Sequence, residues 1–231
     1  MEPAELARLV AALPEPPALG PDGMPFGNRA DPLEELVFIL LTLMTRSQAS
    51  IHATFERLLE LTDGALDRLD EVEEEVLLSA LRPVGLASRR SEQLRTIAGA
   101  VRPAERWRAG LEAAGTEDVL AQLLALPGVG SKTAKCVAMY SLGRPVLPVD
   151  IHVLRVAKRI GLLEGATTWR SADAELERRV PDELKFDVHV RFVAHGRATC
   201  TSIRPSCDTC PVALQCPSAG TTGEPRRSYT R

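Results

Sequence analysis

The sequence has few aromatic residues and no long apolar run. Aromatic side chains make up 4% of the 231 residues, and alanine, leucine, glutamate and arginine dominate the composition. These four residues favour helices, whereas strands are enriched in aromatic and β-branched residues, so the composition argues against a β-sandwich. The longest apolar run, LVFILLTLM from Leu36 to Met44, is too short to cross a bilayer. We expect it to form a buried core helix.

A strong charge of either sign is also missing. The formal net charge of −3 gives no overall attraction to nucleic acid. Residues 56–75 nevertheless carry nine acidic side chains and two arginines, while residues 82–108 carry seven arginines and two glutamates. These stretches are either solvated helix faces or separate acidic and basic surfaces. The acidic start MEPAELARLV lacks the basic region of a secretory signal, so we expect a cytoplasmic protein.

Proline and glycine residues divide the chain into short segments, most of which have a helical pattern. A short amphipathic helix is expected over residues 4–13, before a connector rich in proline and glycine. Helices then follow one another from residue 33 to about residue 115. The pattern also predicts helices from about 117 and over 131–141, 151–160, 170–180 and 182–195, with helical periodicity ending after Gly196. No stretch alternates as a strand would, so the expected fold class is all-α.

The stretch LALPGVGSKTAKCV, residues 124–137, ends one leucine-rich helix and begins another at once. Pro127 ends the first helix, while Gly128 and Gly130 allow positive φ angles and a close approach by another molecule. The N–H groups of the loop and of the next first turn then point outward, which makes a site for an anion. The pattern fits a helix-hairpin-helix that binds a DNA phosphate, although a plain glycine turn between helices has the same signature.

Two charged residues in and after this hairpin are candidate catalytic groups. Lys132 lies in the first turn of the second hairpin helix, where the helix dipole favours a neutral amine that can form a Schiff base. The alternative is an exposed lysine that only contacts phosphate. Asp150, in PVDIHVLRV, is either a carboxylate partner for Lys132 or simply the N-cap of the next helix.

Four of the five cysteines form the pattern C-x6-C-x2-C-x5-C near the C-terminus: Cys200, Cys207, Cys210 and Cys216. In a reducing compartment, four cysteines this close together in sequence indicate a metal site and not a disulfide framework. Zinc sites usually use two tight cysteine pairs, and only one is present, so the spacing favours a [4Fe–4S] cluster. Cys136, on the apolar side of the second hairpin helix, is expected to be buried and inert.

The motif LPGVGSKTA followed by VDIHVLRV resembles the helix-hairpin-helix/Gly-Pro-Asp superfamily of DNA glycosylases, specifically its endonuclease III branch. The similarity extends from about Leu33 to Cys216, and HGRATC with the cysteines matches the [4Fe–4S] loop of that branch. The resemblance implies a bifunctional DNA glycosylase/AP lyase of base excision repair that acts on double-stranded DNA containing oxidised pyrimidines or abasic sites. It further implies that Lys132 attacks C1′ of a flipped-out nucleotide with help from Asp150, and that β-elimination then nicks the strand.

The same resemblance implies two helical domains that flank a DNA-binding cleft. A helical barrel with the hairpin would span residues 33–143. Residues 1–32 and 144–231 would form the iron–sulfur domain. We expect a monomer that makes no contact with a membrane.

Further DNA contacts follow from the resemblance. Gln48, in MTRSQAS, corresponds to a glutamine that fills the space of the extruded nucleotide, and Leu86 to an apolar wedge on the opposite strand. Without the resemblance, the sequence around Leu86 predicts that it is a core leucine. Arg89 and Arg90 are expected to contact the DNA backbone. The other expected contacts lie in the hairpin and beside Asp150: Leu126, Gly128, Val129, Gly130 and His152.

Some positions leave alternatives open. His152 either orients the site or has a capping or core role. Ile151 stands where the family commonly has threonine, and Arg46 where it has a small residue near the base pocket, which bears on the substrate range. Two other functions remain: a monofunctional glycosylase in which Lys132 only binds phosphate, and a non-catalytic iron–sulfur protein that binds DNA or recognises damage.

Overall fold

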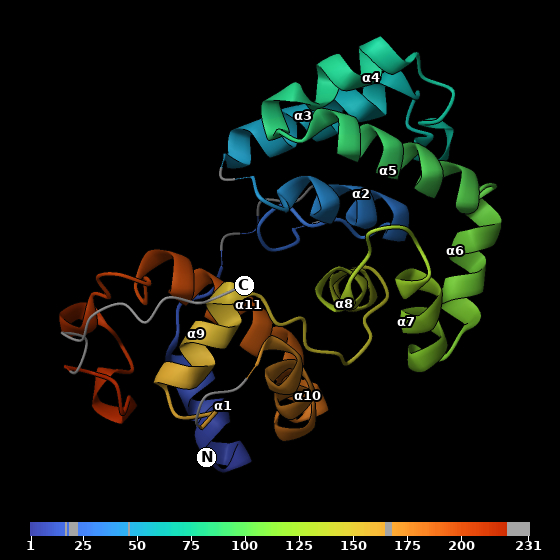
Figure 1. Cartoon of the computed structure of the whole chain (residues 1–231). Coiled ribbons are helices and arrows are strands. Elements are labelled where there is room, and N and C mark those ends of the chain that lie inside the picture. The colour runs from blue at the N-terminus through green and yellow to red at the C-terminus, as the bar shows by residue number, and fades with distance from the viewer. Residues whose placement is uncertain (17, 19–22, 46, 165–167, 221–231) are drawn as a thin grey trace. The chain divides into compact units, whose positions relative to one another are not determined.

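The computed structural model describes residues 1–16, 18, 23–45, 47–164 and 168–220, so Arg46 lies outside the described residues. Within these ranges the chain is helical, with one isolated β-bridge and no strand, as the composition predicted (Figure 1). None of the described helices is long and apolar enough to cross a membrane. The chain divides into two compact units, Pro17–Arg144 and Met1–Pro16 with Pro145–Arg231, and each is considered by itself below.

The unit Pro17–Arg144 contains seven α-helices in its described residues: α2 (Pro32–Thr42), α3 (Gln48–Leu61), α4 (Glu74–Leu81), α5 (Ala87–Ala100), α6 (Ala104–Ala113), α7 (Thr116–Leu124) and α8 (Ser131–Tyr140). Short 3-10 turns, Leu66–Arg68 and Arg82–Val84, lie on either side of α4. Helix α2 packs against both α3 and α8, and α7 packs against α8. This packing places the first turn of α8 beside the buried centre of the unit.

Helix α2 is the core helix expected from the apolar run. Asp31 caps it by accepting hydrogen bonds from the backbone N–H groups of residues 33 and 34 at 2.9 and 3.0 Å, and Pro32 occupies the first turn. Every residue from Glu35 to Leu41 is buried. The apolar run nevertheless extends beyond the helix. Its last two residues, Leu43 and Met44, follow the end of α2 and are exposed.

The boundary before α2 differs from the expected one. Among the described residues, 23–32 belong to the unit of α2, whereas the sequence suggested that residues 1–32 join the cluster domain. The guanidinium of Arg29 lies over the rings of Phe55 and Phe38, at 4.3 and 5.5 Å from their centroids. Its carbonyl also accepts a hydrogen bond from Ser141 at 3.0 Å, next to the end of α8. These contacts fasten the connector to this unit.

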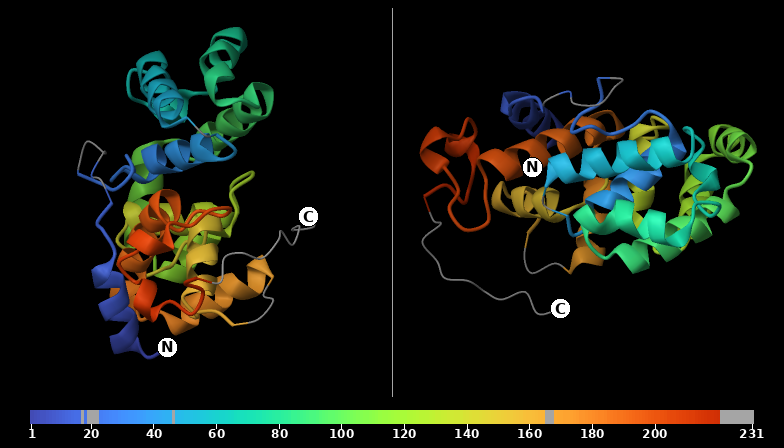
Figure 2. Two further views of the ribbon diagram at one scale, coloured as in Figure 1. Left: turned by 90° about the vertical axis from the view of Figure 1, so that its left-hand side faces the viewer. Right: turned by 90° about the horizontal axis from the view of Figure 1, so that it is seen from above.

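The second unit contains α1 (Pro3–Ala12), α9 (Ile151–Arg159), α10 (Trp169–Arg179) and α11 (Lys185–Ala198). Helix α11 packs against α9 and α1, and α1 (dark blue) lies beside it in Figures 1 and 2. Arg191 of α11 joins the two ends of the sequence, because it donates to the carbonyl of Leu13 and pairs with Glu15 at 2.9 Å. The cysteine loop follows α11 and contains two 3-10 turns, Cys207–Thr209 and Ala213–Gln215.

Gly196 shows where the sequence pattern failed at α11. We expected helical periodicity to end after Gly196, yet α11 continues to Ala198. A Cβ atom at Gly196 would lie 2.9 Å from Cβ of His152 and 3.2 Å from a guanidinium nitrogen of Arg155. This glycine therefore does not end its helix; its lack of a side chain allows α11 and α9 to approach each other.

Candidate functional site

The hairpin between α7 and α8 is built around one glycine. Gly128 has φ of +68°, whereas Gly130 has an extended backbone with φ of −100°, so the expected positive φ holds only for Gly128. Leu126 and Val129 are 9% and 7% exposed and hold the loop against the unit. Their side chains therefore anchor the loop. We expect these two residues to contact DNA mainly through their backbone atoms.

Gly130 is the N-cap of α8, and no side chain caps this helix. An uncapped helix start has N–H groups directed toward a potential anion, at the positive end of the helix dipole. Across the hairpin, the side-chain amide of Gln93 in α5 donates to the carbonyl of Pro127 at 2.9 Å. The side chain of Gln93 thus holds the hairpin loop against α5.

Lys132 is the second residue of α8 and is half-buried. It lies at the junction of the hairpin and the core, directly before the buried stretch of the helix, which begins at Thr133. Its role as a nucleophile remains a prediction, and its placement is compatible with that role because an amine here faces the positive end of a helix dipole.

Asp150 is the N-cap of α9 in the other unit, as its position before the helix predicted. One oxygen of its carboxylate, Oδ1, accepts hydrogen bonds from the backbone N–H groups of His152 and Val153, both at 2.8 Å. This fixes the direction of the carboxylate, which is half-buried. Ile151 follows it with 63% of its side chain exposed, so an apolar surface borders the carboxylate where the family commonly has threonine.

His152 faces α11. Its Nδ1 lies 2.9 Å from a guanidinium nitrogen of Arg155, which also donates to the carbonyl of Gly196 at 2.7 Å. Burial lowers the pKa of His152, although the charge of Asp150 acts in the opposite direction. These contacts favour the alternative of a half-buried packing role over a DNA contact.

A groove of about 510 Å³ lies on the unit of α2, beside the hairpin. Leu86 lines this groove with 55% of its surface exposed, which excludes the core role considered above. Arg89 lines it as well and is exposed. Arg90 is 5% exposed and donates to the carbonyls of Leu40, Leu43 and Gly85, so it supports the groove from inside and is not placed for a backbone contact to DNA.

Met44 is a groove residue that the sequence reasoning missed. It is 88% exposed and adopts φ of +61°, a conformation that residues other than glycine seldom adopt. Gln48, the residue expected to fill the space of an extruded nucleotide, is the exposed first residue of α3 and does not line the groove. Met44 was missed because it ends an apolar run whose other members lie mostly in the core.

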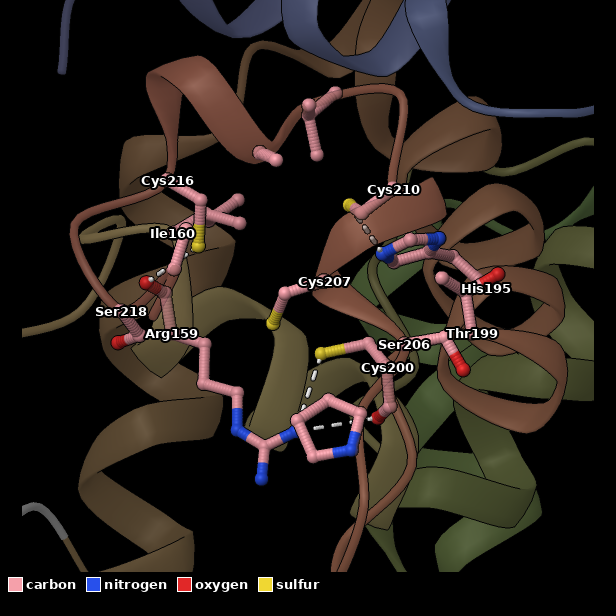
Figure 3. Close-up of a pocket in the computed structure, with 14 residues that line it drawn as sticks. Arg159, Ile160, His195, Thr199, Cys200, Ser206, Cys207, Cys210, Cys216 and Ser218 are labelled. Carbon is pink, nitrogen blue, oxygen red and sulfur yellow. Dashed lines mark hydrogen bonds between the residues drawn. The ribbon is translucent and has the colours of Figure 1, made fainter. Parts of the chain in front are cut away.

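The four cysteines at the C-terminus line one small cavity (Figure 3). Their sulfur atoms do not stand in metal-binding geometry, since the described residues contain no group of three or more His, Cys, Asp or Glu so arranged. Burial, followed by the charges of the neighbouring cysteines, raises the pKa of the Cys210 and Cys216 thiols. Four cysteine sulfurs around one cavity are the donor set that a [4Fe–4S] cluster uses, so these residues fit that group.

Two side chains border this cavity with polar groups. Arg159 of α9 donates to the sulfur of Cys200 at 3.3 Å (Figure 3). It also donates to the carbonyl of Thr201 at 2.7 Å. Nε2 of the buried His195 lies 3.7 Å from the sulfur of Cys210. Cys136 is 1% exposed in α8, which confirms that it is a core residue.

The sequence matches known proteins over most of its length. Residues 42–182 match the HhH-GPD family, described as HhH-GPD superfamily base excision DNA repair protein. Endonuclease III of Rickettsia felis is 28% identical over 197 residues, which cover 82% of this chain and 88% of that protein. Endonuclease III of Treponema pallidum is 44% identical over 88 residues, covering 38% of this chain and 41% of that protein.

Solved structures share the fold. A trapped endonuclease III–DNA covalent intermediate matches with a TM-score of 0.77 at 23% identity, covering 96% of this chain and 98% of that one. A thermostable thymine-DNA glycosylase matches with a TM-score of 0.74 at 17% identity, covering 94% and 96% of the two chains. The chain therefore belongs to the HhH-GPD superfamily of base excision DNA repair proteins. Within that superfamily it is similar to endonuclease III, which confirms the resemblance read from its hairpin and Asp150 motifs.

Proposed function

We propose that this chain is a bifunctional DNA glycosylase and abasic-site lyase that removes oxidised pyrimidines from double-stranded DNA. The observation that carries the proposal is the position of Lys132, in the first turn of an uncapped helix directly after the glycine hairpin. A phosphate contact at such a helix start is available from backbone N–H groups alone. An amine at the same place adds the chemistry of an imine, which a monofunctional enzyme does not need.

The chemistry follows from Lys132 and Asp150. The neutral amine of Lys132 attacks C1′, a C–N bond forms, and the bond between C1′ and the base breaks as the base departs with the electron pair. Asp150, held by two backbone N–H groups, carries negative charge opposite the cation that develops at C1′ and receives the proton released by the amine. The sugar ring then opens: the C1′–O4′ bond breaks, O4′ takes up a proton, and C1′ and the lysine nitrogen form an imine. The imine acidifies C2′, and loss of that proton expels the 3′ phosphate.

The DNA is proposed to contact both units. The start of α8 and the hairpin backbone would bind phosphates, and exposed Arg89 would add a contact from the groove. Leu86 and Met44 would enter the duplex from this groove as apolar wedges, which stabilise the opening that a flipped nucleotide leaves. A flipped base is required because the reacting C1′ is not accessible in a stacked duplex.

We assign the four cysteines to a [4Fe–4S] cluster, which when bound would link the loop after α11 into one compact structure. The residues that would hold it are Cys200, Cys207, Cys210 and Cys216. Arg159 would hold the sulfur of Cys200 and the following backbone in place by its hydrogen bonds. In this proposal the cluster is structural, since base excision transfers no electron.

The proposal is tested on a duplex with a single thymine glycol, in which base release is separated from strand nicking. Released base is revealed by hot alkali, and direct nicking is read without it. We expect wild-type protein to give equal amounts of both products and Lys132→Arg to give neither, although it keeps the charge that contacts phosphate. Base release without nicking would establish a monofunctional glycosylase. Unchanged DNA binding without turnover in any variant would establish a non-catalytic binding protein.

A further inference from the structure

Met44 and Leu86, the two most exposed apolar residues of the groove, lie on separate segments of the unit of α2. Met44 follows the end of α2, and Leu86 is the N-cap of α5. Both adopt positive φ angles, although most of each residue is exposed and makes no packing contact. A residue other than glycine keeps such a conformation where the surrounding structure imposes it. The backbone on either side of these two residues must therefore be held in place.

The guanidinium of Arg90, in the first turn of α5, binds the backbone of both segments at once. Its Nε donates to the carbonyl of Gly85 at 2.9 Å, and Gly85 directly precedes Leu86. Its two other nitrogens donate to the carbonyls of Leu40 and Leu43, the second of which directly precedes the exposed methionine. Arg90 is 5% exposed, so it makes these contacts from beneath the groove.

Thr45 connects the two segments directly. Its hydroxyl donates to the carbonyl of Val84 at 2.9 Å and accepts a hydrogen bond from the guanidinium of Arg90 at 3.2 Å. Thr45 follows Met44, and Val84 lies two residues before Leu86. One network of hydrogen bonds therefore holds the residues on both sides of Met44 and the two residues before Leu86.

The acceptors around Arg90 are neutral. In the part of the chain that the structure describes, the guanidinium binds backbone carbonyls and one hydroxyl, and it pairs with no carboxylate. A planar guanidinium with five N–H donors suits several acceptors in fixed directions, which a lysine would not. A positive charge at the end of α2 would by itself favour the helix dipole. The contacts to Gly85 and Thr45 have a separate effect, because they fix the two segments to each other.

We propose that Arg90 is a positioning residue that holds Met44 and Leu86 as a pair, in the conformation in which both enter the duplex. The inference rests on the function proposed above, in which these two side chains stabilise the opening left by a flipped nucleotide. Without the guanidinium, each segment can relax to ordinary backbone angles, and the two side chains lose their fixed spacing. A side chain that is not held in advance loses conformational freedom on binding, so less of its contact energy keeps the duplex open.

Because one residue supports both apolar side chains, its loss should affect both. We expect Arg90→Met to slow single-turnover excision of thymine glycol paired with adenine by at least about tenfold. Adding Met44→Ala to this variant should slow it further by less than about twofold, because a side chain that is no longer held contributes little. A further tenfold loss in the double variant would show that Met44 acts independently of Arg90, which would overturn the inference.

A second substrate distinguishes positioning from a general loss of stability. Thymine glycol opposite an abasic analogue has no pairing partner, so the duplex is opened there at lower cost. On this substrate we expect Arg90→Met to be within about threefold of wild type. A purely structural role of Arg90 would slow both substrates by the same factor, and this result would contradict the proposal.

Arg95 provides a matched control on the same helix. Its guanidinium also holds a loop by its backbone, through the carbonyls of Val72 and Asp70 at 2.6 and 2.7 Å, and it does not line the groove. Arg95→Met should therefore excise both substrates at wild-type rates. Equal slowing of the paired substrate by Arg95→Met and Arg90→Met would count against a specific role for Arg90.

Thr45→Val keeps the test decisive if Arg90→Met does not fold. This variant removes the hydroxyl between the two segments and leaves the guanidinium in place. We expect it to slow excision of the paired lesion by about threefold and to leave the unpaired lesion unaffected. Circular dichroism would establish that the variant is folded. An unchanged rate on the paired lesion would contradict the inference.

A fluorescence measurement separates this inference from the proposed function. The duplex carries a tetrahydrofuran abasic analogue, which cannot form an imine, opposite 2-aminopurine, whose fluorescence rises when it is unstacked. At saturating protein, we expect wild type and Arg95→Met to raise the fluorescence, and Arg90→Met to raise it at most about half as much. A reduced signal would support the inference even in a protein that cleaves no DNA. Equal signals from wild type and Arg90→Met would overturn it even if the protein proves to be a lyase.

Discussion

Met44 and Leu86 hold apolar side chains in solvent on backbone that most residues avoid. Their φ angles are +61° and +53°, and each such conformation costs on the order of 1 kcal/mol or more. Both line one groove beside Gly128. Strain combined with exposure gives no stability, so we interpret both residues as ligand contacts.

Substituting either residue by alanine should lower excision of thymine glycol by about tenfold, a loss of on the order of 1.4 kcal/mol of transition-state stabilisation. Thermal stability should hardly change, because both side chains are exposed in the free protein. Single-turnover base release measures the effect. Leu214→Ala is the matched control, since Leu214 is fully exposed outside this groove. Equal losses in all three variants would contradict the wedge assignment.

Glu35, a buried residue of α2, also predicts how stability depends on pH. Burial raises its pKa to about 8 in the folded protein against 4.5 ordinarily, so the folded state binds the additional proton between these values. The free energy of unfolding should therefore fall as the pH rises from about 5 to 8, and Glu35→Gln should reduce this fall by roughly 2–4 kcal/mol. Urea unfolding at both ends of that range provides the comparison. A pH dependence equal to that of wild type would show that Glu35 is ionised in the folded protein.

The sequence identified some of the single residues that matter for function or stability and missed others. Leu86 was identified by its place in a family motif. Met44 and Glu35 were not identified, because the exposure of the first and the burial of the second depend on tertiary packing. An acid in the first turn of a helix normally faces solvent near the helix dipole, so nothing local marks Glu35 as a core residue.

At the scale of single elements, the start of α9 combines a structural and a chemical role in Asp150. Alanine at this position removes the acceptor of two backbone N–H groups and should lower the free energy of unfolding by about 1 kcal/mol. Asparagine keeps a capping oxygen and removes the charge. We expect both variants to lose base excision, and only Asp150→Ala to lose stability in thermal unfolding. Full activity in Asp150→Asn would show that the cap, and not the charge, is what the site needs.

Helix boundaries were predictable where the stopping signal is local. Asp150 caps α9 as its position in the sequence indicated, and Gly161, with φ of +78°, follows its end. Gly130 and Gly196 were misjudged. The first is in extended backbone that any residue adopts, and the second lies inside a helix because a neighbouring helix approaches it there. Sequence alone does not distinguish a glycine needed for φ from one needed for space.

At the scale of the whole molecule, the cysteine loop gives a prediction about metal. Four cysteines line a cavity between the end of α9, the end of α11 and the loop itself. We expect purified protein to be yellow-brown and to contain about four iron atoms per chain. Cys207→Ser should lose the colour and the iron and should unfold at a lower temperature, as measured by circular dichroism. A colourless wild-type protein with one bound zinc would contradict the assignment.

The division into two units was only partly readable from the sequence. The observed C-terminal limit of the hairpin unit, after Arg144, lies within one residue of the expected limit at 143. The other limit lies well before the expected residue 33, because Arg29 reaches the aromatic rings of α2 and α3. A connector rich in proline and glycine resembles a linker in sequence, and only its tertiary contacts show which unit it joins.

The central claim, that Lys132 is the nucleophile, is tested most directly by reducing the reaction on an abasic duplex with borohydride and mapping the cross-linked peptide by mass spectrometry. The account predicts one adduct on Lys132, absent from Lys132→Arg, which should still bind the duplex. An adduct on another lysine or on the N-terminal amine, or none in wild type that binds abasic DNA, would contradict it.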